Sequence, residues 1–324
     1  MSGPARQHGA ALLTVLLLLA VMLVVVITLM DDVRLALARS HNSQTQLQGR
    51  EYALAAEQVL RGQLSVLGNS NAQQLAAWHQ REQWLPLDDG LARYRLHDAS
   101  ACFNLNSVVI GAPGQWQRSD SGMAQYHALL RALGLPEAQA SVMADTLLDW
   151  IDADAHSAPA GAEDSHYLAG DTPRRSAGQL LADPSELFSL AHHSAADVQQ
   201  VLPWVCALPD NQPTPLNVNA LAPEQAVLLS MLSAGAMDPQ QARQWLLQRP
   251  PAGWRERAAF LAHPALASMA ADAQLSAQVR LTPQLFALAL TLQRDNGDTE
   301  LHSLFALDPG GHPRLLARRW TLDP

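Results

Sequence analysis

The hydrophobic pattern of the chain changes abruptly near its N-terminus. Residues Ala10 to Met30 form 21 consecutive positions without a charged side chain, and only Thr14 and Thr28 interrupt the apolar run. At about 1.5 Å per residue the run predicts a helix of roughly 31 Å, which is long enough to cross the hydrocarbon core of a bilayer. Arg6 precedes the run and acidic residues follow it directly, so the flanking charges favour an N-terminus in the cytoplasm.

Two simpler interpretations of this run are a secretory signal peptide and a plain signal anchor. A signal peptide has an apolar region of about 7–15 residues that ends at a small-x-small cleavage site. The run in this chain is longer and continues into helix-forming sequence without such a site. Charge alone does not separate a signal anchor from other membrane helices, so that interpretation stays open at this point.

The helical pattern continues beyond the apolar run. No proline occurs between Pro4 and Pro86, and apolar positions continue at intervals to Leu67. A single helix from Ala11 to about Leu67 would be roughly 85 Å long. The sequence Gly68-Asn69-Ser70-Asn71 predicts the end of this helix. The pattern therefore predicts one helix that lies half in the membrane and half on a soluble head.

Alternation of apolar and polar residues, which is typical of strands, occurs only at the two ends of the soluble part. It covers residues 91–98 and returns in three segments, Leu285–Gln293, Glu300–Leu307 and Pro313–Trp320. These three segments are separated by Asn296-Gly297-Asp298 and Pro309-Gly310-Gly311, which predict the turns of an antiparallel sheet. The region between, about Asn106 to Ala277, is helical in pattern. The order predicts an α+β head with a large all-α domain inserted in it.

The inserted segment contains a weak internal repeat. Asn104-Leu105-Asn106 and Asn217-Val218-Asn219 each precede an apolar helix, and Pro136 and Pro239 each begin a partner helix. Such helix pairs resemble the SAM-like or helix-hairpin-helix class, some members of which bind DNA. The hairpins lack a Gly-apolar-Gly turn and have few basic residues nearby, so we interpret them as units of protein packing and expect no nucleic-acid partner.

Negative charge is concentrated in one interval of the inserted segment. Between Arg131 and Arg174 the chain has eight acidic residues and no arginine, whereas its formal net charge is −9 overall. Calcium prefers six to eight oxygen ligands in a flexible loop, although the spacing here is not that of an EF-hand. The alternative is a solvated acidic loop. The candidate ligands are Asp149, Asp152, Asp154, Glu163 and Asp164.

The composition excludes several classes of enzyme. All 21 basic residues are arginines, so the chain has no P-loop lysine, Schiff-base lysine or lysine general base. The sequence has no His-Glu-x-x-His, Cys-x-x-Cys or Gly-x-Ser-x-Gly motif, and its 12 histidines are scattered apart from His192-His193. His166, beside the acidic interval, suits a structural donor. We expect no enzymatic activity, and a hydrolase with a catalytic metal is the least supported alternative.

The N-terminal junction resembles the leader of type IV pilins and pseudopilins. Arg6-Gln7-His8-Gly9 precedes the apolar run, and in that family a prepilin peptidase cleaves after the glycine and methylates the new N-terminus. The resemblance implies cleavage between Gly9 and Ala10 and methylation of Ala10. Most pilins have a glutamate at the fifth mature position, where this chain has Thr14. A subunit without that carboxylate is expected at the tip of a filament, where no earlier subunit receives it.

A second resemblance covers most of the chain. The acidic signature Leu148-Asp149-Trp150-Ile151-Asp152-Ala153-Asp154 and the run Gly161–Leu168 are similar to those of the K-type minor pseudopilin of type II secretion. Ser185-Glu186-Leu187, Pro215–Asn219 and Arg318-Arg319-Trp320 also match, in the order of the family. The resemblance implies a pilin fold with a large helical insertion, and it implies bound calcium.

The two resemblances together imply a function and a location. The chain is expected to be a minor pseudopilin at the tip of the type II secretion pseudopilus, in the inner membrane with its head in the periplasm. Expected partners are the I-, J- and H-type minor pseudopilins, the major pseudopilin, prepilin peptidase, secreted substrate and the outer-membrane secretin. The alternative is a membrane-anchored helix-hairpin-helix protein of a DNA-uptake system. The predicted divisions are a cleaved leader at 1–9, the helix at 10–68, a head at 69–105 and 278–324, and the insertion at 106–277.

Cys102 and Cys206 are the only two cysteines. In a domain that faces the periplasm, a pair of cysteines is expected to form a disulfide. Each precedes one of the Asn-x-Asn repeats, so pseudo-symmetry in the insertion could bring them together. Two buried free thiols are the alternative.

Overall fold

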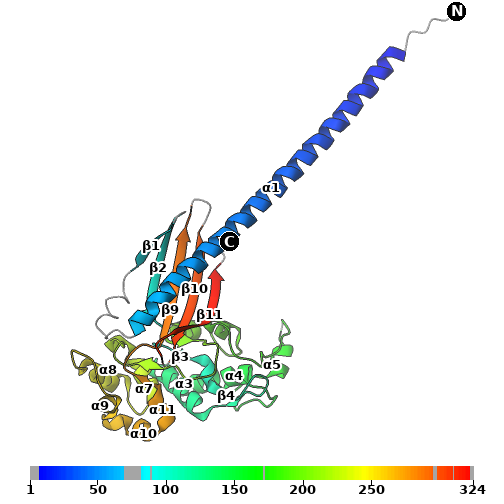
Figure 1. Ribbon diagram of the computed structural model, residues 1–324. Helices are drawn as coiled ribbons and strands as arrows, with labels where there is room; N and C mark the ends of the chain where they lie inside the picture. Colours follow the sequence, from blue (N-terminus) through cyan, green and yellow to red (C-terminus); the bar gives the residue numbers. More distant parts are fainter. Residues whose placement is uncertain are drawn as a thin grey trace, which may run out of the picture.

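The computed structural model describes residues 7–68, 82–87, 90–170, 172–294, 298–308 and 310–321. Figure 1 shows three parts: a long N-terminal helix, a sheet against which the C-terminal part of that helix packs, and a helical domain at one end of the sheet. This arrangement is the predicted α+β head with a helical insertion. Residues 1–6 of the predicted leader, the predicted helix stop at 69–71 and the turn residues 295–297 and 309 lie outside the described residues.

The N-terminal helix α1 (Gln7–Gly68) is continuous over 62 residues. Its N-terminal half projects away from the rest of the molecule (Figure 1). Every side chain from Leu12 to Met30 is exposed. Among the described residues, α1 is the one helix whose length and composition allow it to cross a membrane. The prediction of a single long apolar helix is therefore confirmed.

The sheet has five antiparallel strands in the order β1-β2-β9-β10-β11. Strand β2 ends at Asp98 and pairs with β9, which begins at Leu285, so the whole helical domain is inserted between two neighbouring strands. The edge strand β1, which contains Pro86, was not indicated by alternation in the sequence. The strands are β1 (Gln83–Leu87), β2 (Gly90–Asp98), β9 (Leu285–Gln293), β10 (Thr299–Leu307) and β11 (Pro313–Thr321).

Alternation along the strands places one apolar face of the sheet against α1. Leu288, Leu290 and Leu292 of β9 are all at most 1% exposed, as expected for a strand with one covered face. They share a core with Ala53, Ala56, Leu60 and Leu64 of α1, which recur at helical spacing. The C-terminal half of α1 is thereby fixed to the head, while its N-terminal half is left free for the membrane.

The helical domain has two halves of the same design. The first half begins with β3 and ends with β6, which pair in parallel, and the second begins with β7 and ends with β8, which also pair in parallel. Strands β6 and β7 and several 3-10 helices lie in the region 106–277, whose sequence pattern predicted helices alone, and β3 and β8 lie just outside its two ends. The longer elements are α3 (Asp120–Ala132), α4 (Glu137–Ile151), α6 (Ala195–Val201), α7 (Ala226–Leu232) and α8 (Pro239–Leu247). The shorter ones are β3 (Phe103–Asn104), η1 (Leu105–Val108), β4 (Val109–Ile110), β5 (Gln117–Arg118), α5 (Asp164–Leu168), η2 (Pro184–Ser189), η3 (Leu202–Trp204), β6 (Val205–Cys206), β7 (Leu216–Asn217), η4 (Pro223–Gln225), α9 (Arg257–Leu261), η5 (Pro264–Leu266), α10 (Ala267–Ala271), α11 (Ala273–Gln278) and β8 (Val279–Arg280).

The asparagine repeat has a structural role in each half. Asn106 donates from Nδ2 to the carbonyls of Leu181 (3.0 Å) and Leu208 (2.7 Å), and its Oδ1 accepts from the backbone N–H of Leu181 (2.8 Å). A buried amide that satisfies three backbone groups fixes two distant loops at one point. The first asparagine of the pair, Asn104, accepts from the backbone N–H of Asn106 and so caps the following 3-10 helix.

Asn219 makes the equivalent contacts in the second half. Its Nδ2 donates to the carbonyls of Trp254 and Leu281 at 3.0 Å each, and its Oδ1 accepts from the N–H of Trp254 at 2.8 Å. The two halves are therefore built around one repeated side-chain clamp. In the first half, the clamped residue Leu181 lies 30 positions after the end of α4, whereas in the second half Trp254 lies 7 positions after the end of α8. The acidic loop occupies this additional length.

A disulfide connects Cys102 to Cys206, with 5.8 Å between the two Cα atoms. Cys102 comes just before β3 and Cys206 lies on β6, where it pairs with Asn104. The bond thus closes the first half of the helical domain, where β3 and β6 meet. The expectation of a disulfide is confirmed, and it joins the two ends of one repeat rather than equivalent positions of two repeats.

Candidate metal centre

Three acidic side chains converge in the loop that follows α4. One carboxylate oxygen from each of Asp152, Asp154 and Glu163 lies within 4.8 Å of the others. Asp152 immediately follows the last residue of α4, and Glu163 immediately precedes α5, so two helix ends bring the chain back to the same point. Asp152 is 8% exposed and Glu163 is 5% exposed, while Asp154 reaches in from solvent.

Two oxygens of this cluster are buried without a hydrogen-bond donor. Oδ1 of Asp152 and Oε1 of Glu163 have no partner among the described residues. Burial of an unpaired carboxylate oxygen is costly unless a cation or a donor satisfies it. The donor set of three carboxylates therefore fits a hard cation that prefers oxygen ligands, with backbone carbonyls and water completing its coordination.

Burial and mutual repulsion raise the pKa values of these acids. The pKa of Asp152 is raised to about 7, first by burial and then by the nearby charges of Asp154, Asp149 and Glu163. Burial, followed by the charge of Asp149, also raises the pKa of Glu163. A bound divalent cation would remove both causes, because it neutralises the charges and replaces the lost hydration.

Asp149, one of the predicted ligands, binds a backbone N–H of the loop and is not part of the three-carboxylate cluster. Its carboxylate accepts from the backbone N–H of Ala158, at 3.0 Å to Oδ1 and 3.1 Å to Oδ2. Burial raises its pKa to about 6. Asp145, one helical turn earlier, accepts from the N–H of Ala160 at 3.1 Å. Two carboxylates on one face of α4 thus hold the loop in place above the cluster.

The loop passes so close to the Asp149 carboxylate that only glycine fits at position 161. A Cβ atom at Gly161 would lie 2.0 Å from Oδ2 of Asp149, which is far inside van der Waals contact. The loop reaches the Asp149 carboxylate because this position has no side chain. Neither Asp145 nor Gly161 was expected to position the site; the spacing of Asp145 and Asp149 at i and i+4 on a helix was the available signal.

Asp164 faces the other side of the loop. Its carboxylate accepts from the backbone N–H (2.9 Å) and hydroxyl (3.0 Å) of Ser176 and from the guanidinium of Arg175 (2.9 Å). The hydrogen bond from the Ser176 N–H is the main reason that the pKa of Asp164 is lowered. Of the five predicted ligands, the structure therefore brings three together and gives Asp149 and Asp164 contacts that shape the loop around them.

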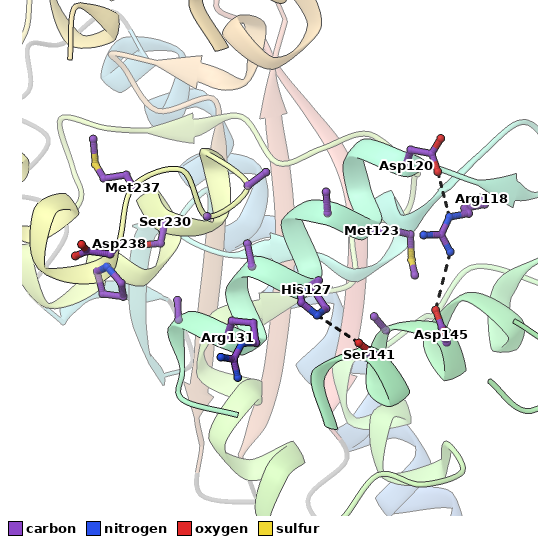
Figure 2. Close-up of a pocket in the computed structure, with 17 residues that line it drawn as sticks. Arg118, Asp120, Met123, His127, Arg131, Ser141, Asp145, Ser230, Met237 and Asp238 are labelled. Atoms are coloured by element: carbon purple, nitrogen blue, oxygen red, sulfur yellow. Dashed lines mark hydrogen bonds and ion pairs between the residues drawn. The ribbon is translucent and has the colours of Figure 1, made fainter. Parts of the chain in front are cut away.

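A separate cleft of about 600 Å³ lies between the two helix pairs of the domain. Figure 2 shows that α3 supplies His127 and Arg131 to it, with Ser141 and Asp145 from α4 on one side and Met237 and Asp238 on the other. His127 Nε2 lies 3.0 Å from Glu137 Oε1 and 3.5 Å from Ser141 Oγ. One nitrogen faces both groups, whereas a serine-type triad needs opposite nitrogens, so these three residues do not form that arrangement.

The helical domain is similar to a known protein family. Two family models, both described as type II secretion system (T2SS), protein K, match residues 101–210 and 216–282. These ranges correspond to the two halves of the helical domain and together cover more than half of the chain.

The chain belongs to the type II secretion system protein K family.

Relatives in this family match the chain over most of its length. The type II secretion system protein K of Klebsiella pneumoniae is 36% identical over 269 residues, covering 81% of each chain. That of Pectobacterium carotovorum is 32% identical over 258 residues, covering 77% of each chain. The resemblance to the K-type minor pseudopilins, drawn from the acidic signature and the terminal motif, is confirmed.

A solved structure supports the fold. A chain in the crystal structure of the GspK-GspI-GspJ complex from the type 2 secretion system of enterotoxigenic Escherichia coli matches with a TM-score of 0.70 and 29% sequence identity. The match covers 88% of this chain and 100% of that chain. The family is that of a structural component of the secretion system.

Proposed function

We propose that this minor pseudopilin occupies the tip of the type II secretion pseudopilus and nucleates its assembly. The observation that carries the proposal is the position of the helical domain at one end of the sheet, away from the N-terminal half of α1 (Figure 1). In a filament that packs its subunits through their N-terminal helices, the next subunit towards the tip would have to occupy that space. A head of this size is accommodated best where no further subunit follows.

The N-terminal half of α1 supports delivery from the inner membrane. Its exposed apolar surface suits a single-pass helix with the N-terminus in the cytoplasm and the head in the periplasm. Prepilin peptidase would cleave between Gly9 and Ala10 and methylate Ala10. Thr14, at the fifth mature position, offers no carboxylate to the N-terminal amine of an earlier subunit, in agreement with a place at the tip.

The partners of a tip subunit are expected along α1. The structure from enterotoxigenic Escherichia coli is of a complex of GspK with GspI and GspJ. We therefore propose the I- and J-type minor pseudopilins as direct partners, followed by the H-type and major pseudopilins below them. Secreted substrate and the outer-membrane secretin are further candidates for the exposed head.

Calcium is the cation proposed for the acidic cluster. Asp152, Asp154 and Glu163 supply hard oxygen ligands, and the cluster includes no thiolate or imidazole that would favour zinc. The ion would connect the end of α4 to the start of α5 and so stabilise the 10 residues between Asp152 and Glu163. We propose a structural role for the ion, because none of these three acidic residues lines the cleft beside His127.

Co-purification tests the tip assignment. The full-length chain would be produced with the I- and J-type minor pseudopilins of its own system, solubilised in detergent and isolated through a tag on the J-type protein. We expect a complex with one copy of each chain, and loss of the complex when residues 10–30 are replaced by an unrelated membrane helix. Incorporation of many copies along a purified pseudopilus would contradict a place at the tip.

A further inference from the structure

Two histidines lie beside the acidic cluster without belonging to it. His166 is in α5 and His192 follows η2, and the centroids of their imidazole rings are 4.9 Å apart, with the ring planes tilted by 54°. Both side chains are exposed. No hydrogen bond or ion pair joins either ring to the part of the chain that the structure describes. Both rings are therefore available to a ligand.

The separation of the rings suits chelation of one metal ion. With metal–nitrogen distances of about 2.0 Å and roughly 1.1 Å from nitrogen to ring centre, two imidazoles on a tetrahedral ion have their centroids about 5 Å apart. The measured separation of 4.9 Å agrees with this value.

The backbone around His192 is held by three side-chain contacts. Tyr167 Oη accepts from the N–H of Ala191 (3.0 Å), His193 Nδ1 donates to the carbonyl of Ala191 (2.9 Å), and Gln139 Nε2 donates to the carbonyl of His192 (3.3 Å). His192 has a φ of +60°, in the left-handed region that residues other than glycine rarely adopt. These contacts impose a conformation that places the His192 ring next to that of His166, and such preorganisation lowers the cost of binding.

We infer that His166 and His192 form a binding site for a transition-metal ion of the zinc, copper or nickel class. Imidazole nitrogen suits these ions, whereas calcium prefers the oxygens of the neighbouring acidic cluster, so the two sites select different cations. Water or a donor from a partner protein completes the coordination. The bound ion connects α5 to the segment at 191–193.

A positively charged side chain, that of Arg174, lies close to His166. The guanidinium of Arg174 lies 5.3 Å from the centre of the Tyr167 ring and lines the same small hollow of about 220 Å³ as His166. Its positive charge opposes a cation, so the two imidazole nitrogens have to provide the affinity by coordination. Removal of either imidazole is therefore expected to weaken binding of the ion.

Calorimetric titration with zinc chloride tests the inference. The full-length chain in detergent would be titrated with calcium in excess, so that the acidic cluster is occupied. We expect one zinc ion per chain, with affinity lowered at least about tenfold in both His166→Ala and His192→Asn. Asparagine tolerates a positive φ, so the second substitution removes the ring while keeping the backbone conformation. His302→Ala, which removes an exposed imidazole from β10, is the matched control and should bind zinc as the parent does.

Copper provides a spectroscopic check on the ligands. The electron paramagnetic resonance spectrum of one bound Cu²⁺ is expected to show coupling to two imidazole nitrogens, and to lose one in each histidine variant. Unchanged zinc affinity in both variants would overturn the inference. Loss of zinc binding in Asp152→Asn but not in His166→Ala would also overturn it, because it would place the ion in the acidic cluster. Equal melting temperatures of the metal-free variants and parent establish that the fold is intact.

Discussion

Glu57 of α1 is buried beneath the sheet and forms an ion pair with Arg318 of β11. Arg318 donates two hydrogen bonds to this carboxylate, and Ser303 of β10 donates a third, at 2.5 Å. Glu57 is 2% exposed, so its charge is almost completely withdrawn from water. Three elements that are far apart in the sequence are thereby joined at one carboxylate, which fixes the direction in which α1 leaves the head.

The first prediction concerns this ion pair. Glu57→Gln should lower the free energy of unfolding of the head by about 2 kcal/mol, because it leaves the guanidinium of Arg318 without its charged partner while that side chain stays partly solvated. Chemical denaturation of the full-length chain in detergent measures the change. Glu51→Gln removes an exposed carboxylate from the same helix and should have little effect. Equal losses in the two variants would show that the buried pair makes no special contribution.

The second prediction concerns pH in the metal-free chain. The pKa of Asp152 in the folded chain is raised to about 7 from an ordinary 3.8. Over the intervening range the folded state binds a proton that the unfolded state has released, so stability from this group is greatest below about pH 4 and is lost as the pH rises towards 7. Excess calcium should reverse the loss at neutral pH by pairing with the ionised cluster.

Asp152→Asn isolates this effect from other titrating groups, such as His193, whose pKa is lowered by burial. Without calcium, the melting temperature of the variant should exceed that of the parent at pH 7 and approach it at pH 4. With excess calcium at pH 7, the parent should gain stability and the variant should gain much less. Glu256→Gln, an exposed acid in the second half of the domain, is the matched control. A calcium response as large in Asp152→Asn as in the parent would refute the assignment of the ligands.

The third prediction concerns Gly161. Gly161→Ala should weaken calcium binding and lower the melting temperature, because its Cβ would displace the loop from the Asp149 carboxylate that holds it. Calorimetric titration with calcium measures the effect. Gly170→Ala is a suitable control, since a Cβ at Gly170 would meet its nearest neighbour at 3.6 Å, an ordinary contact. An unchanged affinity in Gly161→Ala would mean that the position of the loop is not set by Asp149.

The fourth prediction compares the two asparagine clamps. Asn106→Ala and Asn219→Ala each remove three hydrogen bonds to backbone groups, and each should cost about 3 kcal/mol. Only Asn106→Ala should also weaken calcium binding, because Leu181, which Asn106 holds, lies at the far end of the segment that follows the acidic cluster. Denaturation and calcium titration of both variants make the comparison. A similar loss of calcium affinity in both would contradict a local connection between Asn106 and the cluster.

The elements that sequence predicted best are those with long, unambiguous periodicity. The apolar run and the absence of proline gave α1, and strict alternation gave β2, β9, β10 and β11 within one or two residues. Strand β1 was not predicted, because it is only five residues long and contains Pro86, which weakens the alternation of apolar and polar residues. The two-residue strands of the helical domain are too short for any periodicity, and the parallel pairing of β3 with β6 depends on contacts 102 positions apart.

The site was predictable in composition but not in geometry. Charge density along the chain located the acidic loop, yet it could not distinguish Asp152, whose oxygen is buried without a partner, from Asp149, which accepts from the backbone of its own loop. That distinction depends on the path of the chain between α4 and α5. The asparagine repeat was visible in the sequence, but its use as a clamp depends on Leu181 and Trp254, which no spacing identified.

Mass spectrometry of the mature N-terminus tests most directly whether this chain is used as a pseudopilin. The protein would be purified from membranes of cells that contain prepilin peptidase and, as a control, from cells that lack the peptidase. We predict a chain that begins at Ala10 with a methylated amine in the first case, and an uncut chain that begins at Met1 in the second. An unprocessed Met1 chain in the presence of an active peptidase, or cleavage on the periplasmic side of the apolar run, would contradict the account.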